Sequence, residues 1–300
     1  MKRSLLLMLV KAKASAQRLK RLINLQQNSY FSLMETLTWI FISVIIFGGI
    51  IVGILYSFYF LQERIIFNPI NLPKDYKYPF ELPFEEQFYT MDDGTQLNTL
   101  LFKAKEPKGL IFYIHGNADN LRYWGEFAPF FVNLGYDTFM YDFRGFGKSE
   151  GKIKGERGLQ KDAKKLYHYM LKKYPENKII IYGFSIGTGI AARLASKTQS
   201  KALILEAPYY NFIDLVKYHK SYLPANLISK YHFRTNRYLP KVSSPLYIFH
   251  GTEDRRVPYF LGEKLKNSNP RLEFITIEGA THNDMQLMEK YRSKMKKLLN

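Results

Sequence analysis

Residues 178–187 read Lys178-Ile179-Ile180-Ile181-Tyr182-Gly183-Phe184-Ser185-Ile186-Gly187. The apolar first half predicts a buried strand, and the small residues that follow Gly187 predict a closely packed helix. A serine with glycine two positions away on both sides, between a strand and a helix, is typical of a sharp turn that exposes the hydroxyl as a nucleophile. Such a turn crowds the flanking positions, which favours residues without a Cβ. Ser185 is therefore the candidate nucleophile.

Apolar runs alternate with helix-like segments along the last three quarters of the chain. Eight runs predict strands: Phe88–Thr90, Leu97–Lys103, Leu110–Ile114, Asp137–Tyr141, Lys178–Tyr182, Ala202–Leu205, Pro245–Phe249 and Leu272–Ile277. Continuous apolar strands interleaved with amphipathic helices predict an α/β fold, with a mostly parallel sheet covered by helices. Polar residues cluster just after these runs, at the edge where such sheets bind ligands.

A serine hydroxyl needs a general base, and His282 follows the last predicted strand. Asp254 follows the preceding strand and is the candidate that would orient the imidazole. Glu253 and Asp284 are alternative candidates for this acid. We prefer Asp254 because the residues from Arg255 onward are expected to begin the next helix, which leaves Asp254 in the turn. The order Ser, Asp, His agrees with the strand-turn-helix serine pattern.

The oxyanion formed during acyl transfer needs preorganised N–H donors. His115-Gly116-Asn117-Ala118 follows a predicted strand, and its glycine allows the backbone to turn toward the reaction centre. We expect the backbone N–H groups of Asn117 and Ile186 to form this oxyanion hole. The histidines His115 and His250 precede glycines at strand ends and are expected to fix loops by hydrogen bonding.

From Phe88 onward the chain resembles the α/β-hydrolase superfamily, in its esterase- and lipase-like branch. The matching motifs are the H-G-N-A run at 115–118, the G-F-S-I-G run at 183–187, D-F-R-G-F-G-K-S-E-G at 142–151 and H-G-T-E-D at 250–254. The resemblance implies an α/β-hydrolase fold and the triad Ser185, Asp254 and His282 by position. This branch includes membrane-associated hydrolases similar to protein depalmitoylases, which are anchored through an N-terminal cysteine cluster. This chain contains no cysteine.

The segment Thr36–Gln62 carries no charge and is long enough to cross a bilayer, with aromatic residues near both ends. Seven basic residues precede it, against one acidic residue, which places the N-terminus in the cytoplasm and the hydrolase domain outside it. Translation from Met34 would remove those basic residues and favour the opposite orientation. We therefore expect a single-pass membrane protein.

The remaining organisation follows from composition. Residues 1–35 are a basic tail, read either as an irregular segment, which we favour, or as a short amphipathic helix. Residues 63–87 form a Pro-rich connector, and residues 88–300 form the hydrolase domain. Residues 211–239 break the alternation and predict short helices, interrupted at Pro224, that cap the active-site edge.

The formal net charge of +18 raises the question of nucleic-acid binding, but the sequence carries none of the usual nucleic-acid motifs. Attraction to anionic lipid headgroups explains the charge more simply. Histidine spacing predicts no metal site, and no cofactor is expected. The expected substrate is a hydrophobic acyl ester or thioester, and the oligomeric state is left open. The alternatives are a serine peptidase and an inactive membrane-tethered binding or scaffold protein.

Overall fold

The structure is a computed structural model that describes residues 2–300. It divides into two compact units, Met1–Phe58 and Tyr59–Asn300. The second unit contains an eight-stranded sheet with the order β10-β9-β8-β7-β4-β6-β3-β2. Its strands are β2 (Phe84–Thr90), β3 (Gln96–Phe102), β4 (Gly109–Ile114), β6 (Tyr136–Tyr141), β7 (Ile179–Phe184), β8 (Ala202–Glu206), β9 (Leu246–Gly251) and β10 (Leu272–Ile277).

The sheet is mostly parallel, as the alternation predicts. Only the pairings of β2 with β3 and of β3 with β6 are antiparallel. Side chains along β4 alternate between two core clusters: Phe112 lies in one, and Tyr113 lies in the other. A continuous apolar strand is therefore buried on both faces, which is the physical reason for its composition.

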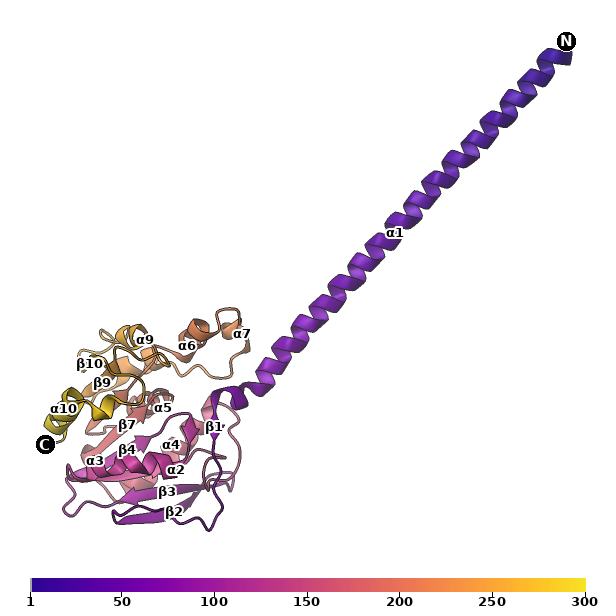
Figure 1. Ribbon diagram of the computed structural model, residues 1–300. Coiled ribbons are helices and arrows are strands. Elements are labelled where there is room, and N and C mark those ends of the chain that lie inside the picture. Colours follow the sequence, from indigo (N-terminus) through magenta and orange to yellow (C-terminus); the bar gives the residue numbers. More distant parts are fainter. Residues whose placement is uncertain (1) are drawn as a thin grey trace. The chain divides into compact units, whose positions relative to one another are not determined.

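Helices cover both faces of this sheet (Figure 1). Residues of α4 (Glu156–Leu171) and α5 (Gly187–Ala195) join the first cluster. The second cluster contains residues of α2 (Leu121–Trp124), α3 (Ala128–Val132) and α10 (Glu289–Leu299). The short helix α9 (Tyr259–Glu263) follows β9, and 3₁₀ turns span Gly125–Phe127, Glu176–Lys178, Leu239–Lys241 and Met285–Leu287.

Between β8 and β9 lie three short helices, α6 (Phe212–His219), α7 (Ala225–Ile228) and α8 (Thr235–Tyr238). The sequence predicts short helices here with a break at Pro224, and α7 begins at the residue after that proline. Because the segment leaves the sheet at the carboxyl end of β8, it starts at the edge where the candidate site residues lie.

The N-terminal segment differs from the expectation of an irregular tail. One helix, α1, runs from Lys2 to Ile66, so the described part of the tail is helical and continuous with the apolar segment. The physical reason is composition: Leu, Lys, Ala, Gln and Arg dominate the tail, and neither Gly nor Pro occurs before Gly48. By length and composition, α1 is the one helix in residues 2–300 that could cross a membrane.

The connector also contains structure that the sequence does not predict. A two-residue strand β1 (Asn68–Pro69) pairs in parallel with β5 (Ala118–Asp119), inside the loop that follows β4. In addition, β2 begins at Phe84, four residues before the expected start of the domain. The chain after α1 is thus built into the edge of the sheet that carries the candidate site.

Candidate active site

Ser185 stands in a strained turn between β7 and α5. Its φ of 51° lies in the left-handed region, which non-glycine residues seldom adopt. A Cβ on Gly183 would lie 2.7 Å from the Cβ of Ala191, and one on Gly187 would lie 2.7 Å from the carbonyl oxygen of His115. Both glycines are therefore required by close packing. The backbone N–H of Ser185 donates to the carbonyl oxygen of Glu206 at 2.9 Å, which ties the turn to the end of β8.

His282 links the serine to a buried carboxylate. Its Nε2 lies 3.0 Å from Ser185 Oγ, and its Nδ1 lies 2.7 Å from Asp254 Oδ2. All three side chains are buried. In this geometry the imidazole can accept the serine proton, and the carboxylate can stabilise the resulting cation.

The loop after β9 holds Asp254 in an ionised state. Its Oδ1 accepts hydrogen bonds from the backbone N–H groups of Arg256 (2.9 Å) and Val257 (2.8 Å). Burial alone would raise the pKa of Asp254, but hydrogen bonding to His250 and His282 outweighs burial and lowers that pKa well below its usual range. Asp254 is thus a carboxylate at neutral pH.

The rival acids lie elsewhere. Asp284 Oδ1 accepts from the backbone N–H of Thr281 at 2.7 Å and thereby closes the turn around His282. Glu253 is exposed, and its backbone N–H donates to the carbonyl oxygen of Ala280 at 3.0 Å. The structure therefore brings Ser185, Asp254 and His282 together and leaves both rivals out of that chain of contacts.

The loop after β4 lies against the start of α5, as the packing of Gly187 on the carbonyl oxygens of Ile114 and His115 indicates. Within this loop, the backbone oxygen of Asn117 accepts from the N–H of Asn68 at 2.9 Å. Its side-chain Nδ2 donates to the carbonyl oxygen of Ile66 at 2.6 Å. The two predicted oxyanion positions, Asn117 and Ile186, therefore lie on adjoining segments.

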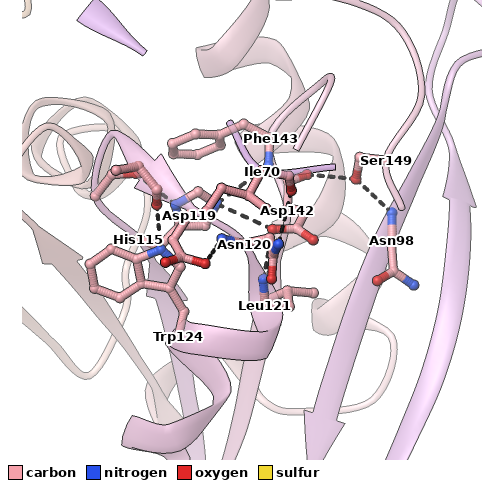
Figure 2. A network of polar contacts seen from close by, with 12 residues as sticks. Ile70, Asn98, His115, Asp119, Asn120, Leu121, Trp124, Asp142, Phe143 and Ser149 are labelled. Carbon is pink, nitrogen blue, oxygen red and sulfur yellow. Dashed lines mark hydrogen bonds and ion pairs between the residues drawn. The ribbon is translucent and has the colours of Figure 1, made fainter. Parts of the chain in front are cut away.

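His115 fixes this loop. Its Nε2 accepts from the backbone N–H of Phe143 at 3.4 Å, and its Nδ1 donates to the carbonyl oxygen of Gly116 at 2.7 Å (Figure 2). Burial lowers the pKa of His115 to about 4, so the ring is neutral at pH 7. Figure 2 also shows Asp142, whose Oδ1 accepts from the N–H of Leu121 at 3.0 Å. Burial raises the pKa of Asp142 well above its usual range.

The sequence does not predict a buried polar cluster that lies next to the turn holding Ser185. The buried Glu206 Oε2 accepts from the hydroxyl of Tyr182, from that of Tyr291 (3.2 Å) and from Nε2 of Gln286 (3.3 Å). Burial raises the pKa of Glu206 to about 7. The available signal is a glutamate that ends the apolar run Ala202-Leu203-Ile204-Leu205.

Comparison with known proteins extends these observations. The family model for serine aminopeptidase, S33, matches residues 105–235. Human alpha/beta hydrolase domain-containing protein 17B is 32% identical over 210 residues, which cover 66% of this chain and 68% of that protein. The chain belongs to the α/β-hydrolase family. The superfamily and the fold implied by the sequence motifs are thereby confirmed.

Other relatives of this α/β hydrolase are matched over smaller shares of their length. Alpha/beta hydrolase domain-containing protein 17C of Xenopus tropicalis is 34% identical over 63% of this chain, which spans 61% of that relative's length. Lysophosphatidylserine lipase ABHD12 of Danio rerio is 32% identical over 55% of this chain and 47% of that protein. The Pyrococcus furiosus esterase Pf2001 superposes with a TM-score of 0.61 at 21% identity, over 77% of this chain and 98% of the esterase, and supports the fold.

Proposed function

We propose that this chain is a membrane-anchored serine hydrolase that cleaves carboxylic esters or thioesters with hydrophobic acyl groups. The observation that carries the proposal is the chain of contacts from Ser185 Oγ through His282 to Asp254. A buried serine next to an oriented imidazole is an activated nucleophile. Esterases and lipases among its relatives and structural neighbours support ester substrates.

The reaction would proceed through an acyl-enzyme. Ser185 Oγ attacks the acyl carbon while His282 Nε2 takes the hydroxyl proton, and the carbonyl oxygen becomes an anion facing the N–H groups of Asn117 and Ile186. The tetrahedral intermediate collapses when His282 returns the proton to the leaving alcohol or thiol. Water, activated by the same imidazole, then hydrolyses the acyl-enzyme and regenerates the serine.

The anchor is α1. Its apolar residues are exposed in the structure, which supports a membrane around it. Three of its hydroxyl groups bond inside the helix: Thr36, Thr38 and Ser57 donate to the carbonyl oxygens four residues earlier, at 2.8, 2.8 and 2.9 Å, so these three carry no unpaired donor into lipid. We place the basic N-terminal flank in the cytoplasm and the hydrolase domain outside it, by the excess of Lys and Arg before the span.

The acyl preference is tested with a series of p-nitrophenyl esters from acetyl to palmitoyl, kept below their micellar concentrations. Burying each CH₂ contributes roughly 0.8 kcal/mol, so kcat/KM should rise with chain length until the site is full. Leu215, a partly buried residue of α6, is the residue to truncate, and Leu215→Ala should flatten the rise. A steady decline from acetyl onward in both proteins would contradict a hydrophobic acyl group.

A serine peptidase is the second candidate, favoured by the description of the matching family model. The same three side chains can cleave an amide, which differs mainly in its poorer leaving group. Comparing aminoacyl p-nitroanilides with the ester series separates the two activities. Turnover of the anilides at rates equal to or above those of the esters would favour the peptidase.

A further inference from the structure

The short helices between β8 and β9 expose an unusual run of side chains. Every residue from Lys217 to Tyr222 is exposed, and the run contains two tyrosines and two lysines. Leu227, in the next helix α7, is 84% exposed, compared with 69% for Tyr222 and 54% for Tyr218. We call Lys217, Tyr218, Lys220, Tyr222 and Leu227 the cap patch.

The cap patch is basic as well as apolar. No Asp or Glu occurs between Leu215 and Thr252, a stretch that holds Lys217, Lys220, Arg234, Arg237 and Lys241, as well as Lys230, which pairs with Glu63. Tyrosine with lysine beside an exposed leucine is the composition of surfaces that lie at the lipid headgroup level, where aromatic rings and cations meet anionic lipids.

The cap patch adjoins the end of α1. Gln62 Nε2 donates to the carbonyl oxygen of Ile228 at 2.6 Å, and Gln62 Oε1 accepts from the N–H of Lys230 at 2.8 Å. Lys230 Nζ also lies 3.2 Å from a carboxylate oxygen of Glu63. Gln62 is buried by these contacts. Ile228, the residue after Leu227, is therefore hydrogen-bonded to Gln62, the residue at which the proposed span ends.

The same surface borders the catalytic edge. His219 Nε2 donates to the carbonyl oxygen of Arg256 at 2.8 Å, and the N–H of Arg256 donates to Asp254. Arg255 and Arg256 are exposed next to the triad acid, and the Phe260 ring lies 5.6 Å from that of Tyr218. A surface that contacts the cap patch would thus lie beside the loop that holds Asp254.

We propose that the cap patch binds the anionic headgroup surface of the bilayer that holds α1, so that acyl substrates enter the site from the membrane. This proposal rests on the membrane anchoring proposed above. The basic charge and the attachment to Gln62 select a lipid surface over a second copy of the chain or another protein.

The absence of cysteine makes a site-specific probe available. Leu227→Cys in the full-length chain is labelled with an environment-sensitive fluorophore and reconstituted into phosphatidylcholine vesicles, with or without phosphatidylglycerol. Glu106→Cys is the matched control, because Glu106 is exposed in the β3–β4 connection at the opposite edge of the sheet. We expect nitroxide lipids to quench the probe at position 227 and not at 106, with stronger quenching in anionic vesicles. Equal, low quenching at both positions would overturn the proposal.

Charge provides a second, independent readout. Each cation near an anionic surface strengthens the attraction about five-fold at low salt, so replacing two of them should weaken contact about 25-fold. We expect this loss for Lys217→Gln with Lys220→Gln, and no loss for Lys296→Gln with Lys297→Gln, which are exposed in the last turns of α10. Equal quenching at position 227 in both pairs would contradict an electrostatic contact.

Two further measurements separate the possible failures. Flotation of the chain with the vesicles shows whether α1 anchors it in the membrane. Hydrolysis of p-nitrophenyl acetate shows whether the catalytic site is active. A chain that floats and hydrolyses while position 227 stays unquenched refutes the lipid contact alone, whereas a chain that does not float refutes the anchoring and the contact with it. In detergent without vesicles, the fluorescence of the probe at position 227 should not change with protein concentration. A change with protein concentration would show that a second copy covers the cap patch and would overturn the proposal.

Discussion

The side-chain amide of Asn117 donates a hydrogen bond of 2.6 Å to the backbone carbonyl oxygen of Ile66, the last residue of α1. The backbone oxygen of Asn117 accepts from Asn68, and β1 pairs with β5 just beyond. The end of α1 is therefore bonded to the loop that carries a proposed oxyanion donor.

Asn117→Ala keeps the backbone N–H but removes the bond to Ile66. We expect kcat to fall by up to about 10-fold with little change in KM, because a misplaced donor loses transition-state stabilisation rather than substrate binding. Asn177→Ala, at an exposed asparagine, is the control. Steady-state kinetics with a short ester measure both parameters, and an unchanged kcat would show that the loop holds its place without the bond.

Ser185→Ala should abolish ester hydrolysis, since removing a triad serine costs several orders of magnitude in kcat. The fold should persist because the change removes only the hydroxyl. A fluorophosphonate probe, which reacts with activated serines, should label the wild type and not the variant. Labelling of both proteins would place the nucleophile elsewhere, and labelling of neither would favour an inactive scaffold.

Asp254→Asn should favour the wrong tautomer of His282 and lower kcat by up to about 10⁴-fold. Asp284→Asn should cost far less, because Asp284 binds the backbone of Thr281 and not the imidazole. The kcat values of the two variants on one ester decide between the acids. A larger loss in Asp284→Asn would reverse the assignment.

The span is tested by extraction. The full-length chain should stay in the membrane pellet in alkaline carbonate, because moving the apolar residues of α1 into water would be strongly unfavourable. Replacing Ile45 and Ile46 with Lys, near the middle of the apolar segment, should shift the chain toward the supernatant. Release of the wild-type chain would refute the span.

The sequence predicts the central strands well because each is a continuous apolar run bounded by polar residues, as in Ile179–Phe184. It also predicts which serine, histidine and aspartate meet, since each follows a different strand and the carboxyl ends of parallel strands converge. A short amphipathic helix within the basic tail is only the less favoured reading of the sequence, and one continuous helix over residues 2–35 is not predicted, because helix propensity competes there with high charge.

Contacts between distant segments are what local patterns cannot predict. The pairing of Asn68–Pro69 with Ala118–Asp119 involves two residues on each side, too short for any periodicity. The cluster around Glu206 is assembled from β7, β8 and the C-terminal helix, and its tyrosines resemble ordinary core aromatics in sequence.

Glu206 gives a pH prediction with a defined sign. Burial raises its pKa to about 7 from an ordinary value of 4.5, so the folded chain binds this proton more tightly than the unfolded chain does. The contribution of Glu206 to the free energy of unfolding is therefore fully present at pH 4. It declines by roughly 3 kcal/mol as the pH rises toward 8. Glu206→Gln cannot ionise, so its Tm relative to the wild type should rise between pH 5 and pH 8. Glu278→Gln, at an exposed glutamate, should follow the wild type. Parallel Tm curves for the wild type and Glu206→Gln in detergent solution would show that Glu206 does not titrate in this range, and that its contacts with Tyr182 and Tyr291 hold it in one protonation state.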